Sequence, residues 1–116
     1  MDLNELITRA GGDYEQTLRR FAGNEAIMHR FALKFPQDPS FQEMAEGVAR
    51  KDYSLVERAA HTMKGTAANL GFQALSDCST ALVLAVREGD YSSADSRFET
   101  VKGAYLELIG WIGALA

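Results

Sequence analysis

The chain has 116 residues, of which 47% are apolar and 24% charged, and these values are typical of one ordinary globular domain. No apolar run approaches the roughly 18 residues that a membrane span needs, and the first residues show no signal peptide, so we expect a cytoplasmic protein that binds no membrane. The net charge of −4 argues against nucleic-acid binding, which requires clustered lysine and arginine.

The first third of the chain is predicted to form short helices. Residues 1–12 are expected to be a leader segment or a short amphipathic helix, and a helix comes next over about residues 13–21. Asn24 can cap the next helix, and Pro36 ends or bends it. The apolar stripe of that helix, which we expect to be buried, consists of Ile27, Met28, Phe31 and Phe35. Ser40 is expected to cap the helical segment after Pro39, either a separate helix or the continuation of a kinked one.

Three longer helices are predicted in the remainder of the chain. The first begins at Asp52 and ends where Gly71 can adopt the left-handed conformation, and Gly89 ends the second in the same way. The last helix places its apolar residues in alternating steps of four and three: Ala94, Phe98, Val101, Tyr105, Leu108, Ile112 and Leu115. We therefore predict an all-α fold, an antiparallel four-helix bundle over residues 13–116 with short accessory helices before it.

The helix that starts at Asp52 carries an exposed histidine. At 100° per residue, one side of this helix is apolar and consists of Val56, Ala59, Ala60, Met63, Ala67 and Leu70. His61 points to the opposite side, with Lys64 and Gly65 one turn further along. The side chains that flank this group are Glu57, Arg58 and Ala68. Mid-helix glycine costs about 1 kcal/mol relative to alanine, so Gly65 indicates a packing or functional requirement.

This pattern favours phosphoryl chemistry. A solvent-exposed imidazole is mostly neutral at pH 7, and the neutral ring has a nucleophilic nitrogen. Lys64 offers three donors and a positive charge where an anion on the ring would lie, and Gly65 leaves the ring uncovered for a second macromolecule. On these residues alone, an ordinary surface histidine beside an ordinary lysine remains an alternative, because such short patterns are common.

The segment His61-Thr62-Met63-Lys64-Gly65-Thr66-Ala67-Ala68-Asn69-Leu70-Gly71 resembles the His-x-x-Lys-Gly signature of histidine-containing phosphotransfer (HPt) domains. The resemblance extends from about residue 13 to the C-terminus. It implies a four-helix bundle whose exposed histidine accepts a phosphoryl group from a receiver-domain aspartate of a sensor kinase, which can be a hybrid kinase, and passes it to a response-regulator receiver.

By this resemblance, His61 is the phosphorylation site and Lys64 neutralises the phosphoryl oxygens. Gly65 keeps the ring accessible, and Gly71 belongs to the adjacent turn. From their place on the helical wheel beside His61, Arg58, Glu57 and Ala68 are candidate docking residues. The sequence departs from many family members at Phe72, where a small residue is common, and at Val83, where Glu is common. Both departures bear on partner choice rather than on the relay.

The resemblance implies a phosphocarrier and not an enzyme. We expect no intrinsic cofactor, with Mg²⁺ supplied by the receiver, and a monomer. The single cysteine and two histidines match no metal-ligand spacing, so no metal site is predicted. An ATP-dependent kinase is disfavoured because no glycine-rich phosphate loop is present. A docking or dimerisation bundle that acts without phosphorylation remains the alternative.

We expect His29 to be a solvated surface residue and Cys78 to fill space in the core. The sequence is compatible with a free-standing protein and with a domain of a hybrid kinase.

Overall fold

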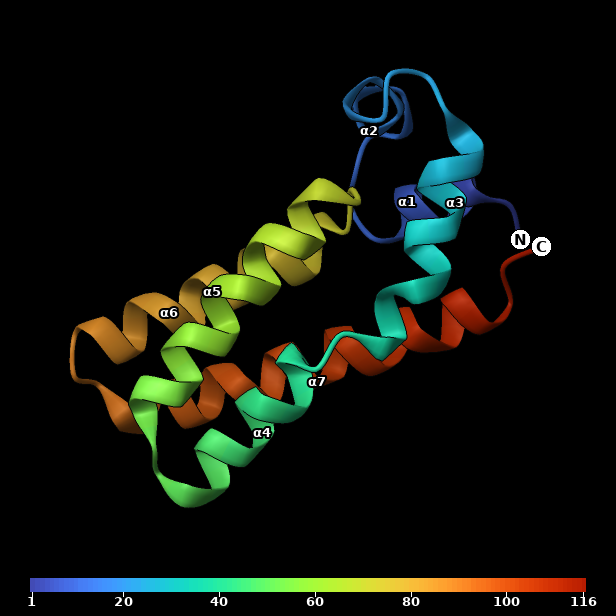
Figure 1. The fold of residues 1–116 in the computed structure, drawn as a ribbon. Helices are drawn as coiled ribbons and strands as arrows, with labels where there is room; N and C mark the ends of the chain where they lie inside the picture. The colour runs from blue at the N-terminus through green and yellow to red at the C-terminus, as the bar shows by residue number, and fades with distance from the viewer.

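The computed structural model describes residues 1–116 and contains only helices, as the sequence predicts. They are α1 (Leu3–Arg9), α2 (Tyr14–Arg20), α3 (Glu25–Lys34), the 3₁₀ turn η1 (Phe35–Gln37), α4 (Ser40–Arg50), α5 (Tyr53–Asn69), α6 (Gln73–Arg87) and α7 (Tyr91–Gly113). Helices α4–α7 pack into a bundle, and α1–α3 gather at the end where both chain termini lie (Figure 1). None of the helices combines the length and the hydropathy that a membrane-spanning segment requires.

The bundle helices begin and end at the residues that the sequence indicates. The Asp52 and Asp90 side chains accept hydrogen bonds from backbone amides three residues on, so each caps the helix that comes after it. Gly71 and Gly89 have φ values of 78° and 73°, which lets the chain turn sharply into the next helix. Adjacent bundle helices therefore run antiparallel, and α5 and α6 pack along their length.

The predicted core of the bundle is confirmed. All six apolar positions of the wheel on α5 are buried, and so are six of the seven predicted positions of the last helix, with Leu115 partly exposed. Aromatic rings extend the core toward the accessory helices. Phe35 meets Phe72 edge-on with ring centroids 5.2 Å apart, and Phe41 stacks on Tyr105 at 4.1 Å.

Residues 1–12 pack tightly against the bundle. Leu3, Leu6 and Ile7 on α1 are buried in the common core. The Ala10 carbonyl oxygen accepts a hydrogen bond of 2.9 Å from the amide of Ala74 at the start of α6. The N-terminal amino group also lies 3.0 Å from the Ala114 carbonyl oxygen, which brings the two ends of the chain together. The division of the chain at residue 13 stays a prediction.

The structure corrects three expectations for the accessory region. Met28 and Ala32 of α3 and Phe35 of η1 are buried, whereas Ile27 and Phe31 are 37% and 48% exposed, so the predicted apolar stripe is only half buried. Figure 1 shows α3 at the end of the bundle beside α1, outside the four packed helices, so only part of its apolar stripe meets the core.

The other two corrections concern Ser40 and His29. Ser40 is the first residue of α4 rather than its cap, and the Asp38 carboxylate accepts from its amide. His29 is half buried rather than solvated, because its Nε2 lies 2.8 Å from the carbonyl oxygen of Ala116. Pro36 does end α3, and α4 is a separate helix.

Candidate functional site

His61 stands on the exposed side of α5, as the helical wheel predicts. The inward side of the helix is closed by buried neighbours, among them Ala60 at 0% exposure and Met63 at 0%. The imidazole is therefore carried by a 17-residue helix and faces away from the core. A ring in this position can meet a reacting group brought by another molecule without any opening of the bundle.

The positive charge beside His61 has no acidic partner within the chain. The structure contains three ion pairs, and none of them involves Lys64 or Arg58. Glu57, which the sequence places in the same patch, is instead paired with Arg87 of α6, with Nε and Oε2 3.4 Å apart. Because Arg87 offsets the carboxylate, the face around the histidine is more basic than the sequence alone indicates.

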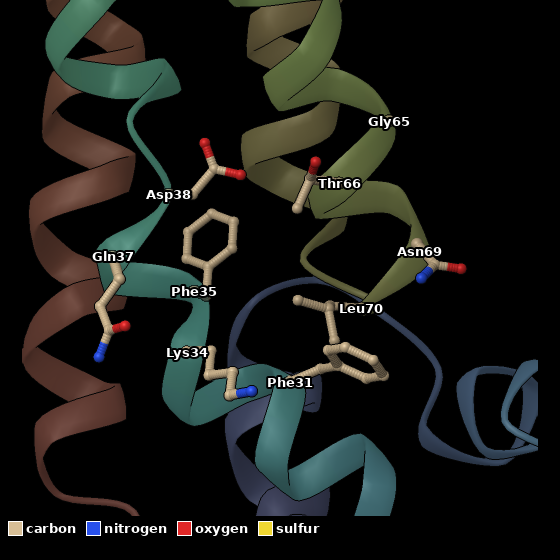
Figure 2. Close-up of a pocket in the computed structure, with 9 residues that line it drawn as sticks. All are labelled: Phe31, Lys34, Phe35, Gln37, Asp38, Gly65, Thr66, Asn69 and Leu70. Carbon is tan, nitrogen blue, oxygen red and sulfur yellow. The ribbon is translucent and has the colours of Figure 1, made fainter.

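Gly65 opens the surface between His61 and a neighbouring groove. A Cβ added at Gly65 would meet nothing within 4 Å, so no packing contact inside the chain requires glycine there. The groove begins at Gly65 and has a volume of about 600 Å³. One wall is the C-terminal half of α5, and the other is the end of α3 with η1 (Figure 2). It is lined by Phe31, Lys34, Phe35, Gln37, Asp38, Gly65, Thr66, Asn69 and Leu70.

The groove combines an apolar floor with charged edges. Figure 2 shows the rings of Phe31 and Phe35 between the two walls, with Leu70 beside them. Lys34 and Asp38 bring opposite charges to its rim. The sequence does not predict this wall, because its periodicity places Phe31 and Phe35 in the core. The periodicity of α3 shows which residues share one side of the helix, but it does not show whether that side is buried in the core or lines an open groove.

Two of the predicted site residues, Gly71 and Ala68, lie at the C-terminal end of α5 and contact α2. Gly71 is buried, and a Cβ on it would lie 2.5 Å from the Thr17 hydroxyl of α2. Ala68 is half buried, and its carbonyl oxygen accepts a hydrogen bond of 2.7 Å from Arg20 Nη1. Helix α2 therefore holds the end of α5 in place at this point.

The remaining reactive side chains form no second centre. No group of three or more His, Cys, Asp and Glu side chains is placed to hold a metal ion. Cys78 is half buried on α6, and desolvation by burial raises the pKa of its thiol. The sulfur is therefore held as the protonated thiol at neutral pH, which is less nucleophilic than the thiolate.

A comparison with protein families identifies the bundle that carries His61. A model of the Hpt domain family matches residues 37–111, which is more than half of the chain and includes His61 and the helices that hold it. Searches of curated proteins and of solved structures returned no significant match. The family match places helices α4 to α7 in one known architecture, and the chain belongs to the Hpt domain family.

Proposed function

We propose that this protein is a phosphorelay intermediate in which His61 carries the phosphoryl group. Hpt domains act in histidine phosphotransfer, interact with receiver domains of two-component systems and are carriers rather than enzymes. The observation that supports the assignment of His61 is its exposure on α5 together with an unpaired Lys64 one turn away. The immediate donor is a receiver aspartate of a sensor kinase, and the acceptor is the receiver of a response regulator.

The transfer is a direct exchange between two nucleophiles. A neutral imidazole nitrogen, which we assign as Nε2, attacks the phosphorus of the receiver's aspartyl phosphate, so a P–N bond forms as the P–O bond breaks. The aspartate leaves as a carboxylate, and the ring retains its proton on Nδ1. The second transfer runs in reverse toward another aspartate. Lys64 offsets charge on the moving phosphoryl oxygens, and we assign the Mg²⁺ to the receiver.

The receiver is proposed to dock over His61 and the neighbouring groove. Phosphorylation places the negative phosphoryl oxygens on the ring, and the basic face around Lys64 and Arg58 accommodates them. The same face complements an acidic receiver pocket. The exposed ring of Phe31 in the groove gives an approaching helix or loop an apolar surface to bury. We assign Gly65 the role of admitting the receiver close to the ring and place the reaction in the cytoplasm.

The two histidines of the chain allow a matched test. Incubation with a phosphorylated receiver should label the wild-type chain and His29→Gln, whereas His61→Gln should stay unlabelled with an unchanged circular dichroism spectrum. Labelling of His61→Gln would contradict the proposal. Unchanged partner output in cells that carry His61→Gln would favour a bundle that acts only by docking or dimerisation.

A second experiment distinguishes a phosphoryl carrier from an ATP-dependent kinase. Radiolabelled ATP alone should leave the wild-type chain unlabelled, because the phosphoryl group is expected to arrive only from a receiver. Autophosphorylation would overturn the assignment of the chain as a carrier.

A further inference from the structure

Ser76 of α6 forms a buried hydrogen bond to the backbone of α5 beside the exposed face. Its hydroxyl donates to the carbonyl oxygen of Lys64 across 3.0 Å, and the residue is 4% exposed. This carbonyl belongs to the peptide unit that joins Lys64 to Gly65. The two helices are therefore joined about one turn C-terminal to the proposed phosphoryl carrier, His61.

Helix α5 needs support at this level. Glycine in mid-helix is less favourable than alanine, because its backbone loses more freedom when the helix forms. Gly65 also has no side chain that could pack, and the space around it is open. A hydrogen bond from the opposite side of the helix restrains the peptide unit that glycine leaves most free. The Ser76 hydrogen bond thus offsets the loss of helix stability that glycine causes at position 65.

We propose that Ser76 is a positioning residue for phosphotransfer. Its hydrogen bond keeps the peptide unit between Lys64 and Gly65 helical. The backbone from which the Lys64 side chain extends is thereby held in a fixed position relative to the His61 ring. The kinetic part of this inference rests on the proposed function, whereas the restraint on α5 is a property of the fold. Ser76 acts through Lys64 and does not touch the reacting atoms.

The chain offers a matched control on the same helix. Ser79 is also buried, at 0% exposure, but its hydroxyl has no hydrogen-bond partner. Ser76→Ala and Ser79→Ala each remove one buried hydroxyl oxygen, and only the first removes a bond to α5. A difference between the two variants therefore reports on that bond rather than on a change of volume.

Amide hydrogen exchange of the unphosphorylated chain tests the restraint directly. In Ser76→Ala, protection of the amides of residues 65–68 should fall about fivefold, as expected for one lost buried hydrogen bond, and more than at residues 56–60. Ser79→Ala should show no selective fall. A uniform fall along α5, or the same pattern in both variants, would overturn the restraint. In a Gly65→Ala background the effect of Ser76→Ala should shrink, and an undiminished effect would contradict the compensation for glycine.

Transfer kinetics test the positioning role. With a phosphorylated receiver as donor, Ser76→Ala should lower the rate of transfer to His61 about fivefold at an unchanged folded fraction, and Ser79→Ala should not. In a Lys64→Ala background, Ser76→Ala should have no further effect, since the positioned side chain is gone. An undiminished effect there, or an unchanged rate in the single variant, would overturn the positioning role. An unlabelled wild-type chain would instead refute the proposed function and leave the exchange result standing.

Discussion

Lys64 and His61 lie one turn apart on α5, and no carboxylate in the chain pairs with Lys64. Gly65 has no side chain, and Glu57 is engaged by Arg87. The ammonium of Lys64 is therefore the charge best placed to meet a phosphoryl group on the ring. Its contribution should appear in the rate of transfer more than in docking, because charge on the moving phosphoryl group is offset at the ring itself.

Lys64→Ala should slow transfer from a phosphorylated receiver about tenfold while affinity for the unphosphorylated receiver changes little. Lys102→Ala is the matched control, because Lys102 also precedes an exposed mid-helix glycine but lies on α7. Single-turnover transfer and a binding titration give the two quantities. Equal transfer rates for Lys64→Ala and the wild type would refute the role of Lys64.

A second residue-scale effect concerns Tyr14, whose hydroxyl hydrogen-bonds Glu25 and links α2 to α3. This hydrogen bond, followed by desolvation and the charge of Glu25, raises the pKa of Tyr14 to about 12. Because the folded value exceeds the unfolded one, the stabilisation is complete below about pH 10 and disappears as pH rises toward about 12.

Titration of tyrosinate absorbance checks this expectation. Glu25→Gln should bring the pKa of Tyr14 back toward its ordinary value, because the hydrogen-bonded anion is removed. A titration curve that is the same in wild type and Glu25→Gln would show that the hydrogen bond to Glu25 does not set the pKa of Tyr14.

At the scale of helices, α1 and α2 support the turn at the C-terminal end of α5. Ile7 is fully buried, and its Cγ2 lies against the backbone at both Gly12 and Gly71. Arg20 and Thr17 add contacts from α2 to the end of α5. The accessory helices, which precede the segment matched by the Hpt family model, thus help to fix the end of the helix that carries His61.

Ile7→Ala should lower the free energy of unfolding by about 3 kcal/mol, because it leaves a cavity where α1 meets the turn. Thr8→Ala, at the exposed neighbouring position, should change it by less than about 1 kcal/mol. Denaturant unfolding of both variants provides the comparison. A loss below about 1 kcal/mol in Ile7→Ala would show that α1 contributes little to the fold.

The elements also show what periodicity can predict. For α5 and α7 it identifies the buried side correctly, because both are long helices packed along the bundle axis. It fails for α3, a short helix that crosses the end of the bundle and leaves Phe31 exposed. The exposure of His61 is predictable from local winding alone. The groove and the Ser76 bond are not, because each joins residues whose proximity only tertiary packing creates.

At the scale of the whole molecule, the site and the core occupy separate regions. The aromatic rings of Phe35, Phe41, Phe72, Phe98 and Tyr105 form a continuous series of contacts inside the molecule. His61 takes no part in this series and lies on the outer side of α5. The groove connects the two regions, since Phe35 belongs to the series and also lines the groove.

Phe31→Ala should weaken receiver binding about tenfold, because a central aromatic contact in the docking groove is lost. The fold should be retained, since the side chain is half exposed. Leu106→Ala is the control, because Leu106 is also apolar and is 55% exposed on α7, outside the groove. Isothermal titration with an unphosphorylated receiver measures both. Equal loss of affinity in the two variants would place docking elsewhere.

The meeting of the chain ends has a practical consequence for building new proteins from this bundle. The Ala116 amide donates to the Met1 carbonyl oxygen over 2.8 Å, so a few added residues suffice to close the backbone into a ring. Such a ring can be reopened at Gly89, where the turn between α6 and α7 has open space around it. The resulting circular permutant would keep the α5 surface intact while giving the polypeptide a different order of synthesis.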